Sequence, residues 1–192
     1  GEWMVVGDGA ETGFVAADEH TERVYFMANK ESPLERHLYV TQLDAKRPGE
    51  PRKLSREPGW HDAKLLPGGR GYFDLHSSPT QPPSASLRKL DGSVQHWLVR
   101  NSLDPSHPYH EHWKEHAKEE FGSIAAADGQ LLYYRLIKPT HIEAGKRYPV
   151  VIDTYGGPHA QYVRKDWMGG ARAPQGYFRQ VLAQHGFVVF SI

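Results

Sequence analysis

The first hundred residues alternate short apolar clusters with turn residues, and no long helical period interrupts them. Clusters such as Val24-Tyr25-Phe26, His37-Leu38-Tyr39-Val40 and Gly71-Tyr72-Phe73 have the length and composition of β-strands. We therefore predict that the N-terminal half is built from short strands joined by turns.

A weak internal repeat runs through this half. At an offset of 47 positions, Arg23, Tyr25, Phe26, Leu43 and Asp44 match Arg70, Tyr72, Phe73, Leu90 and Asp91. A period in the forties is the length of one four-stranded propeller blade, which buries its faces only by stacking on neighbouring blades. Two blades do not close a ring, so blade faces would be left open. A small β-sandwich gives the same strand spacing, and the repeat alone does not decide between them.

The composition changes between Asn101 and Glu120, where Asp, Pro, His, Glu and Lys replace the strand pattern. Such a stretch is typical of an inter-domain connection. We place the boundary near residue 118, so that the domains are 1–118 and 119–192. Within the connection, His112 to Lys118 carries alternating acidic and basic side chains that favour a short helical turn.

The second half has a different pattern, which opens with a predicted hairpin. Asp128-Gly129 separates two strand-like runs, 121–127 and 130–138, and this dipeptide favours a tight type I′ turn. A buried strand is then predicted around Val150-Val151-Ile152, with Pro149 at its start.

A helix from about Gln175 to Gln184 follows, ended by Gly186 in the left-handed conformation, and Phe187 to Ile192 begins another buried strand. This order of elements is the opening of an α/β sheet.

Composition and charge narrow the class of protein. The 192 residues are 39% hydrophobic and 24% charged, which is typical of a globular chain. Basic and acidic residues both number 23, so no net field favours nucleic acid or an anionic membrane surface. The absence of cysteine excludes disulfides and thiolate chemistry, and no apolar run approaches the length of a membrane span.

The candidate chemistry lies in the run Asp153-Thr154-Tyr155-Gly156-Gly157-Pro158-His159, where the predicted buried strand ends. Reactive groups of open α/β sheets collect at the carboxyl ends of strands. Gly156 and Gly157 permit a sharp turn that Pro158 stiffens, so Tyr155 would present its hydroxyl to a cleft and donate to a developing oxyanion. The alternative is that Gly-Gly-Pro is only a turn and Tyr155 only a packed aromatic residue.

Several segments together resemble the dipeptidyl peptidase IV branch of the prolyl oligopeptidase family. They are Glu35-Arg36-His37-Leu38-Tyr39, Gly71-Tyr72-Phe73, Ser77-Ser78, Pro82-Pro83, Leu90-Asp91-Gly92, Lys146-Arg147-Tyr148-Pro149-Val150-Val151, Tyr155-Gly156-Gly157-Pro158-His159-Ala160-Gln161 and Trp167. The resemblance covers almost the whole chain, and the stretch from Tyr148 to Pro158 is its most specific part.

The resemblance implies a β-propeller fragment followed by the first elements of an α/β-hydrolase domain. It implies that Tyr155 helps to bind the tetrahedral oxyanion, with Gly156, Gly157 and Pro158 as support. The chain has no Gly-x-Ser-x-Gly; Ser123 and Ser191 stand in other contexts. The nucleophile, acid and base are therefore expected beyond this chain, which alone would be inactive. No cofactor is implied.

By the same resemblance, the whole protein would be a serine peptidase that releases Xaa-Pro or Xaa-Ala dipeptides from peptide N-termini. It would be a homodimer in the periplasm or outside the cell. Two alternatives stay open, namely an oligopeptidase or acylaminoacyl peptidase of the same family, and a non-catalytic propeller module that binds a partner.

Other candidate sites have simpler explanations. His112 and His116 lie four positions apart, as paired zinc ligands do, but the glutamate of a metalloprotease motif is missing, and a solvated histidine-rich linker explains the pattern. Asp8-Gly9 and Asp91-Gly92 are interpreted as hairpin turns rather than calcium loops. The basic cluster Arg164, Lys165 and Arg172 is interpreted as solvated surface. No metal site is predicted.

Overall fold

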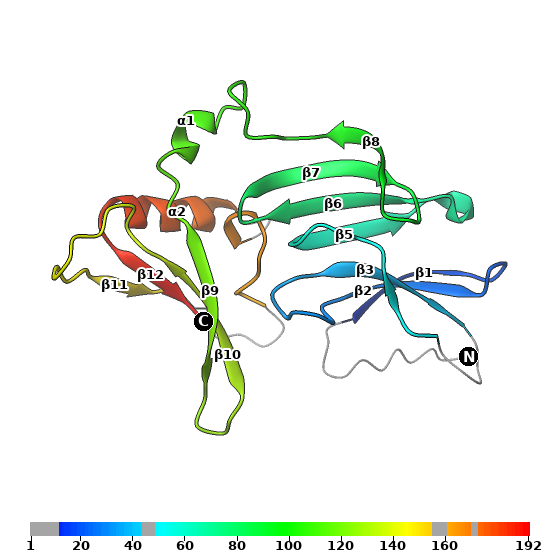
Figure 1. Cartoon of the computed structure of the whole chain (residues 1–192), viewed down its shortest axis with the longest axis horizontal. Helices are drawn as coiled ribbons and strands as arrows, with labels where there is room; N and C mark the ends of the chain where they lie inside the picture. The colour runs from blue at the N-terminus through cyan, green and yellow to red at the C-terminus, as the bar shows by residue number, and fades with distance from the viewer. Residues whose placement is uncertain (1–11, 44–48, 155–160, 170–172) are drawn as a thin grey trace. The chain divides into compact units, whose positions relative to one another are not determined.

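The computed structural model describes residues 12–43, 49–154, 161–169 and 173–192 (Figure 1). The chain divides into two compact units, Gly1–Asn101 and Ser102–Ile192. Each unit is described below by itself.

The first unit contains two four-stranded antiparallel sheets, each with its strands in sequence order. The first sheet consists of β1 (Thr12–Asp18), β2 (Arg23–Ala28), β3 (His37–Gln42) and β4 (Arg52–Lys53). The second sheet consists of β5 (Trp60–Leu65), β6 (Tyr72–Ser78), β7 (Gln81–Arg88) and β8 (Val94–Val99), with the short 3₁₀ turn η1 (Pro67–Gly69) after β5. The predicted all-β character of this half is confirmed.

The weak sequence repeat corresponds to equivalent strands of the two sheets. Tyr25 lies in β2 and Tyr72 in β6, which are the second strands of their sheets. Both rings are almost completely buried and belong to one apolar cluster together with Met27, Leu38 and Leu54. The repeated tyrosines Tyr25 and Tyr72 therefore help to pack the two sheets together, as residues of stacked blades do.

The second unit contains one mixed four-stranded sheet in the order β11-β12-β10-β9. Its elements are α1 (His110–Trp113), β9 (Glu119–Ala125), β10 (Leu131–Ile137), β11 (Val150–Ile152), η2 (Trp167–Gly169), α2 (Ala173–Gln184) and β12 (Val188–Ser191). Strands β11 and β12 are parallel and α2 connects them, whereas β9, β10 and β12 pair antiparallel.

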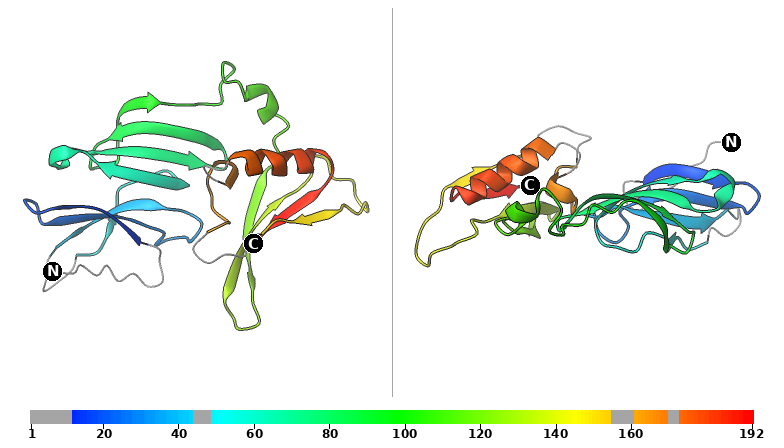
Figure 2. Two further views of the ribbon diagram at one scale, coloured as in Figure 1. Left: turned by 180° about the vertical axis from the view of Figure 1, so that it is seen from behind. Right: turned by 90° about the horizontal axis from the view of Figure 1, so that it is seen from above.

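Helix α2 covers one face of this sheet, as the view from above in Figure 2 shows. Ala183 of α2 is buried against Ile137 of β10 and Val189 of β12. Gly186 follows the helix with φ of 85°, as predicted, because glycine reaches the left-handed region without steric cost. The predicted helix and the strand after it are confirmed.

The hairpin between β9 and β10 is also confirmed, but the predicted turn type is wrong. A type I′ turn needs positive φ at both central residues, and only Gly129 (φ 85°) has it, while Asp128 does not. The amide of Gly129 donates to the carbonyl of Ala126, and the Asp128 carboxylate accepts from the amide of Gln130. The loop is therefore one residue longer than a type I′ turn and ends with the left-handed Gly129, as in a type I turn followed by a bulge.

Strand β11 forms where it was predicted, but its side chains are not buried. Val150 is 59% exposed and Ile152 is 69% exposed. Val150 and Ile152 pair with Val188 and Phe190 of β12, which alternate with Val189, the residue that packs against Ala183 of α2. Because side chains alternate between the two faces of a strand, Val150 and Ile152 lie on the face of the sheet away from α2. An apolar run therefore indicated a strand here without indicating its surroundings.

Residues 102–118 group with the second unit, whereas the change in composition had placed the boundary near residue 118. The side chain of Gln180 in α2 accepts from the amide of Ala117 at 2.8 Å and donates to the carbonyl of Ala117 at 3.1 Å. The His116 ring stacks on Trp167, with ring centroids 5.6 Å apart. The picture of a fully solvated linker is therefore wrong for this end of the segment.

Candidate functional site

The predicted site lies at the carboxyl end of β11 in the second unit. The amide of Asp153 donates to the carbonyl of Phe190 in β12, which extends the pairing of the sheet by one residue. The residues to which the sequence assigned chemistry, Tyr155, Gly156, Gly157 and Pro158, lie outside the described residues. The site is therefore built from the residues on either side of them.

Asp153 and Tyr162, which flank that segment, are joined by a hydrogen bond. The Tyr162 hydroxyl donates to Asp153 Oδ1 at 2.8 Å, across nine positions of sequence. Arg179 from α2 binds both residues: its Nε donates to Asp153 Oδ2 and one of its terminal nitrogens donates to the Tyr162 hydroxyl. We call these three residues the Asp153–Tyr162–Arg179 clamp.

The charge states within the clamp follow from these contacts. Burial by itself would raise the pKa of the Asp153 carboxyl, but hydrogen bonds from Arg179 and Tyr162 outweigh it and lower that pKa below its usual value. Burial and the hydrogen bond to Asp153 raise the pKa of the Tyr162 phenol. At neutral pH the clamp therefore consists of a carboxylate, a neutral phenol and a guanidinium.

A second set of buried charges lies in the same unit. Arg135 of β10 is completely buried, and one terminal nitrogen of its guanidinium lies 3.7 Å from Glu119 Oε2 in β9. Burial raises the pKa of the Glu119 carboxyl to about 7, although Arg135 opposes the shift. Arg164 pairs with buried Asp166 at 2.8 Å, so this member of the predicted surface cluster is an ion-pair partner instead.

Sequence reasoning did not identify Tyr162, Arg179 or Arg135 as part of the site. Arg179 is 26 positions from Asp153, and no motif connects an arginine within a helix to a strand end that distant. The available signals were the carboxylate at the end of an apolar strand and a helix bearing one cation among apolar neighbours, Phe178 and Val181. Neither signal predicts from the sequence that Arg179 binds Asp153.

In the first unit, three imidazoles stack between the two sheets. His37 of β3, His61 of β5 and His76 of β6 are buried, with centroid separations of 5.1 Å between His37 and His61 and 4.3 Å between His61 and His76. We call them the histidine stack. Burial lowers the pKa of His37 to about 4 and lowers that of His76 in the same direction.

The central ring of the histidine stack differs from its neighbours in its contacts. Nδ1 of His61 faces both carboxylate oxygens of Asp74, at 3.0 and 3.1 Å, and Nε2 faces the carbonyl of Glu57 at 2.8 Å. Asp74 also pairs with the buried guanidinium of Arg88 at 2.9 Å. Both ring nitrogens of His61 thus face hydrogen-bond acceptors.

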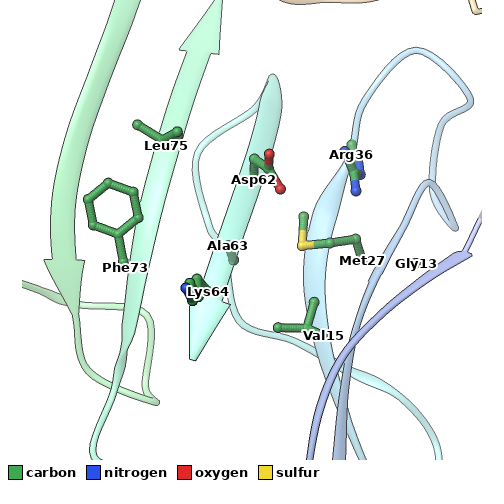
Figure 3. Close-up of a pocket in the computed structure, with 9 residues that line it drawn as sticks. All are labelled: Gly13, Val15, Met27, Arg36, Asp62, Ala63, Lys64, Phe73 and Leu75. Carbon is green, nitrogen blue, oxygen red and sulfur yellow. The ribbon is translucent and has the colours of Figure 1, made fainter. Parts of the chain in front are cut away.

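The first unit also contains an open pocket of about 420 Å³ that is lined by residues of both sheets (Figure 3). Its lining residues are Gly13, Val15, Met27, Arg36, Asp62, Ala63, Lys64, Phe73 and Leu75. Aliphatic and aromatic side chains form its walls, with the carboxylate of Asp62 and the cations Arg36 and Lys64 among them. This composition suits a partly polar ligand and includes no hydroxyl, thiol or imidazole nucleophile.

Two absences hold for the described ranges. No group of three or more histidine, cysteine, aspartate or glutamate side chains there is placed to hold a metal ion. His112 and His116 instead take part in an aromatic cluster with Tyr109. No helix of those ranges has the length and apolar character needed to cross a membrane.

Comparison with known proteins gives the class of protein first. Residues 1–83 match the family described as the dipeptidyl peptidase IV (DPP IV) N-terminal region. The crystal structure of Porphyromonas gingivalis dipeptidyl peptidase 4 superposes with a TM-score of 0.79 at 24% identity, covering 97% of this chain and 25% of that one. This likeness concerns the fold, and the mostly β structure is consistent with a β-propeller fragment.

Two relatives that align with most or all of the chain identify the family to which it belongs. Dipeptidyl peptidase 8 of Mus musculus is 33% identical over 203 residues, which covers 100% of this chain and 21% of that protein. Probable dipeptidyl-aminopeptidase B of Emericella nidulans is 31% identical and covers 92% of this chain and 19% of that protein. The chain thus spans about a fifth of the length of these relatives. The chain belongs to the dipeptidyl peptidase IV-like proteins, and the predicted resemblance is confirmed.

Proposed function

We propose that this chain is part of a serine peptidase that releases N-terminal dipeptides, Xaa-Pro or Xaa-Ala, from peptides through an acyl-enzyme. The observation that carries the proposal is the similarity to named dipeptidyl peptidases along the whole chain, including the strand β11 that leads into Tyr155-Gly156-Gly157-Pro158. In this proposal, residues 1–118 are the last blades of a propeller together with the linker that follows them, and residues 119–192 open an α/β-hydrolase domain.

The role proposed for Tyr155 is donation of a hydrogen bond to the oxyanion of the tetrahedral intermediate. Support comes from its position in the sequence, three residues after the end of β11. Open α/β sheets place reacting groups at the carboxyl ends of their strands. Gly156, Gly157 and Pro158 would hold its turn. The nucleophile, the acid and the base are proposed to lie outside the chain, which has no Gly-x-Ser-x-Gly. From the resemblance alone, we also propose that the whole protein is a homodimer.

The test uses the whole protein and a Gly-Pro chromogenic amide. We expect turnover that a serine reagent abolishes, and the Tyr155→Phe variant is expected to lower kcat by about 10²–10³, the usual loss for one oxyanion donor. Tyr148→Phe is the matched control, because the Tyr148 hydroxyl accepts from the amide of Glu143 and donates to the carbonyl of His141, two groups near it in sequence. The 192-residue chain alone is expected to show no turnover.

Other outcomes would point elsewhere. Cleavage of peptides with blocked N-termini, without release of dipeptides from peptides with free N-termini, would favour an oligopeptidase or acylaminoacyl peptidase. An inactive whole protein that binds peptides would favour a binding module. Serine-reagent-sensitive turnover by the pure 192-residue chain would contradict the assignment of the nucleophile to sequence outside it.

A further inference from the structure

The pocket of the first unit holds charges of both signs that do not pair with one another. Arg36, Asp62 and Lys64 all line it (Figure 3), and none of them forms an ion pair within the described residues. Charges that only join two sheets are expected to pair, as Arg88 of this unit does with Asp74. The charges of the pocket are therefore available to a ligand.

Arg36 is held in place at the wall of the pocket. Its guanidinium carbon lies 5.8 Å from the centre of the Trp60 ring, and one terminal nitrogen lies 3.5 Å from the point where a Cβ would stand on Gly13. The residue is only partly exposed, which distinguishes it from an ordinary solvated cation. A planar guanidinium held in this way binds a carboxylate through two parallel hydrogen bonds.

The floor of the pocket is apolar. Met27 is 2% exposed and belongs to the main apolar cluster of the unit, and Val15 and Ala63 pack against that cluster. The volume of about 420 Å³ is at the lower end of the range of small-molecule sites, about 300–1,000 Å³. The lining thus suits a small ligand with apolar side groups and charged ends.

The spacing of the charges along β5 sets the length of that ligand. The amide of Arg36 donates to the carbonyl of Gly59 at 3.1 Å, and the amide of His61 donates to the carbonyl of Arg36 at 2.9 Å, so Arg36 lies beside Trp60. Asp62 is two positions further along the strand, a rise of about 7 Å. An extended dipeptide separates its ammonium from its carboxylate by about the same distance.

We propose that this pocket binds dipeptides with two free ends, with the ammonium on Asp62, the carboxylate on Arg36 and apolar side chains on the floor. Lys64 adds positive charge near the same carboxylate oxygens or those of an acidic side chain. The inference goes beyond the proposed function and does not depend on it, because the pocket includes no residue to which catalysis is assigned. Dipeptides are nevertheless the product that the proposed function would release.

The test is calorimetric titration of the whole protein with Leu-Leu. This dipeptide has apolar side chains and lacks the proline or alanine that the proposed peptidase site would favour. It is expected to bind with a Kd of about 0.1–1 mM. Acetyl-Leu-Leu, which lacks the ammonium, and Leu-Leu amide, which lacks the carboxylate, are each expected to bind about tenfold more weakly or worse.

Two variants assign each end of the ligand to its side chain. Asp62→Asn is expected to weaken Leu-Leu about tenfold and to leave the binding of acetyl-Leu-Leu within about threefold, because the lost partner is the same. Arg36→Gln is expected to give the corresponding result with Leu-Leu amide. Arg52→Gln, which removes an exposed cation of β4 in the same unit, is the control and is expected to bind Leu-Leu as the unchanged protein does.

Absence of Leu-Leu binding up to about 10 mM, or equal binding after either end is blocked, would overturn the inference without reference to any variant. Equal binding by Asp62→Asn and by the unchanged protein would overturn it as well. Hydrolysis of the Gly-Pro amide is measured on the same preparation. Hydrolysis without Leu-Leu binding would contradict this inference alone, whereas end-dependent binding of Leu-Leu without hydrolysis would contradict only the proposed function.

Discussion

At the scale of single residues, the histidine stack shows how polar groups can occupy the space between two sheets. Nε2 of His37 lies 3.2 Å from the carboxylate of Glu35, and its Nδ1 lies 2.9 Å from the Ser55 hydroxyl, so a neutral ring can donate to one and accept from the other. His76 donates to the carbonyl of Pro58. The rings of His37 and His76 are both satisfied in the neutral form, which fits their lowered pKa values.

This arrangement predicts that acid destabilises the first unit. An unfolded histidine titrates near pH 6.5, whereas burial lowers the pKa of folded His37 to about 4, although the hydrogen bond to Glu35 opposes this shift. Between these values the unfolded state binds more protons, so the free energy of unfolding falls as pH decreases from about 6.5 to about 4, by at most about 3 kcal/mol for His37.

Urea unfolding at several pH values between 7 and 4 measures this dependence. His37→Gln is expected to flatten the pH dependence, whatever its effect on stability at neutral pH. His96→Gln, at an exposed position of β8, is the control and is expected to keep the dependence of the unchanged chain. A His37→Gln profile parallel to that of the unchanged chain would show that the stack does not couple protons to folding.

At the scale of elements, local sequence chemistry predicted most strands and the helix after β11, but not their surroundings. Asp128-Gly129 indicated a hairpin correctly, yet the turn type depended on one additional residue. The apolar composition of β11 indicated a strand, while the exposure of Val150 and Ile152 followed from which face of the sheet α2 covers. Periodicity and turn residues act within a few positions, whereas burial depends on partners far away in sequence.

Helix α2 contains a glycine whose presence is explained by packing alone. Glycine is a poor helix former, but a Cβ at Gly176 would overlap the carbonyl oxygen and the Cβ of Met168 in η2. Met168 is buried and has a φ of 52°. The close approach of η2 to α2 therefore requires a residue without a side chain at this position.

Gly176→Ala is accordingly expected to destabilise the second unit by about 1–2 kcal/mol, because the overlap outweighs a gain of about 1 kcal/mol in helix propensity. Thermal unfolding followed by circular dichroism measures the change. Gln184→Ala, at an exposed position near the end of α2, is the control and is expected to change stability by less than about 0.5 kcal/mol. A more stable Gly176→Ala protein would mean that η2 does not pack as described.

At the scale of the whole molecule, the two sheets of the first unit are stacked on one side only. The face of the second sheet that carries Leu75 of β6 and Val99 of β8 is open, and these side chains are 46% and 53% exposed. Ala85 of β7 pairs with both, so the three residues form one row across the sheet. In a propeller, the next blade covers such a face.

The isolated 192-residue chain is therefore expected to self-associate as its concentration rises, because exposed apolar rows and free strand edges favour association. Leu75→Lys is expected to reduce this association, measured by sedimentation velocity over a tenfold or larger range of concentration. Ile142→Lys changes an equally exposed apolar residue in the second unit and is expected to leave it unchanged. Equal behaviour of both variants would exclude the open face as the cause.

The sequence by itself determined the local elements, the two-sheet repeat and the motif that carries the family resemblance, because each depends on spacing and turn chemistry within a short stretch. Only the tertiary structure decided that Asp153, Tyr162 and Arg179 meet, that three histidines stack, and that Gly176 contacts Met168. These contacts join positions far apart in the chain or in different elements. They exist only after packing has fixed the distances between strands and helices, and no local pattern encodes those distances.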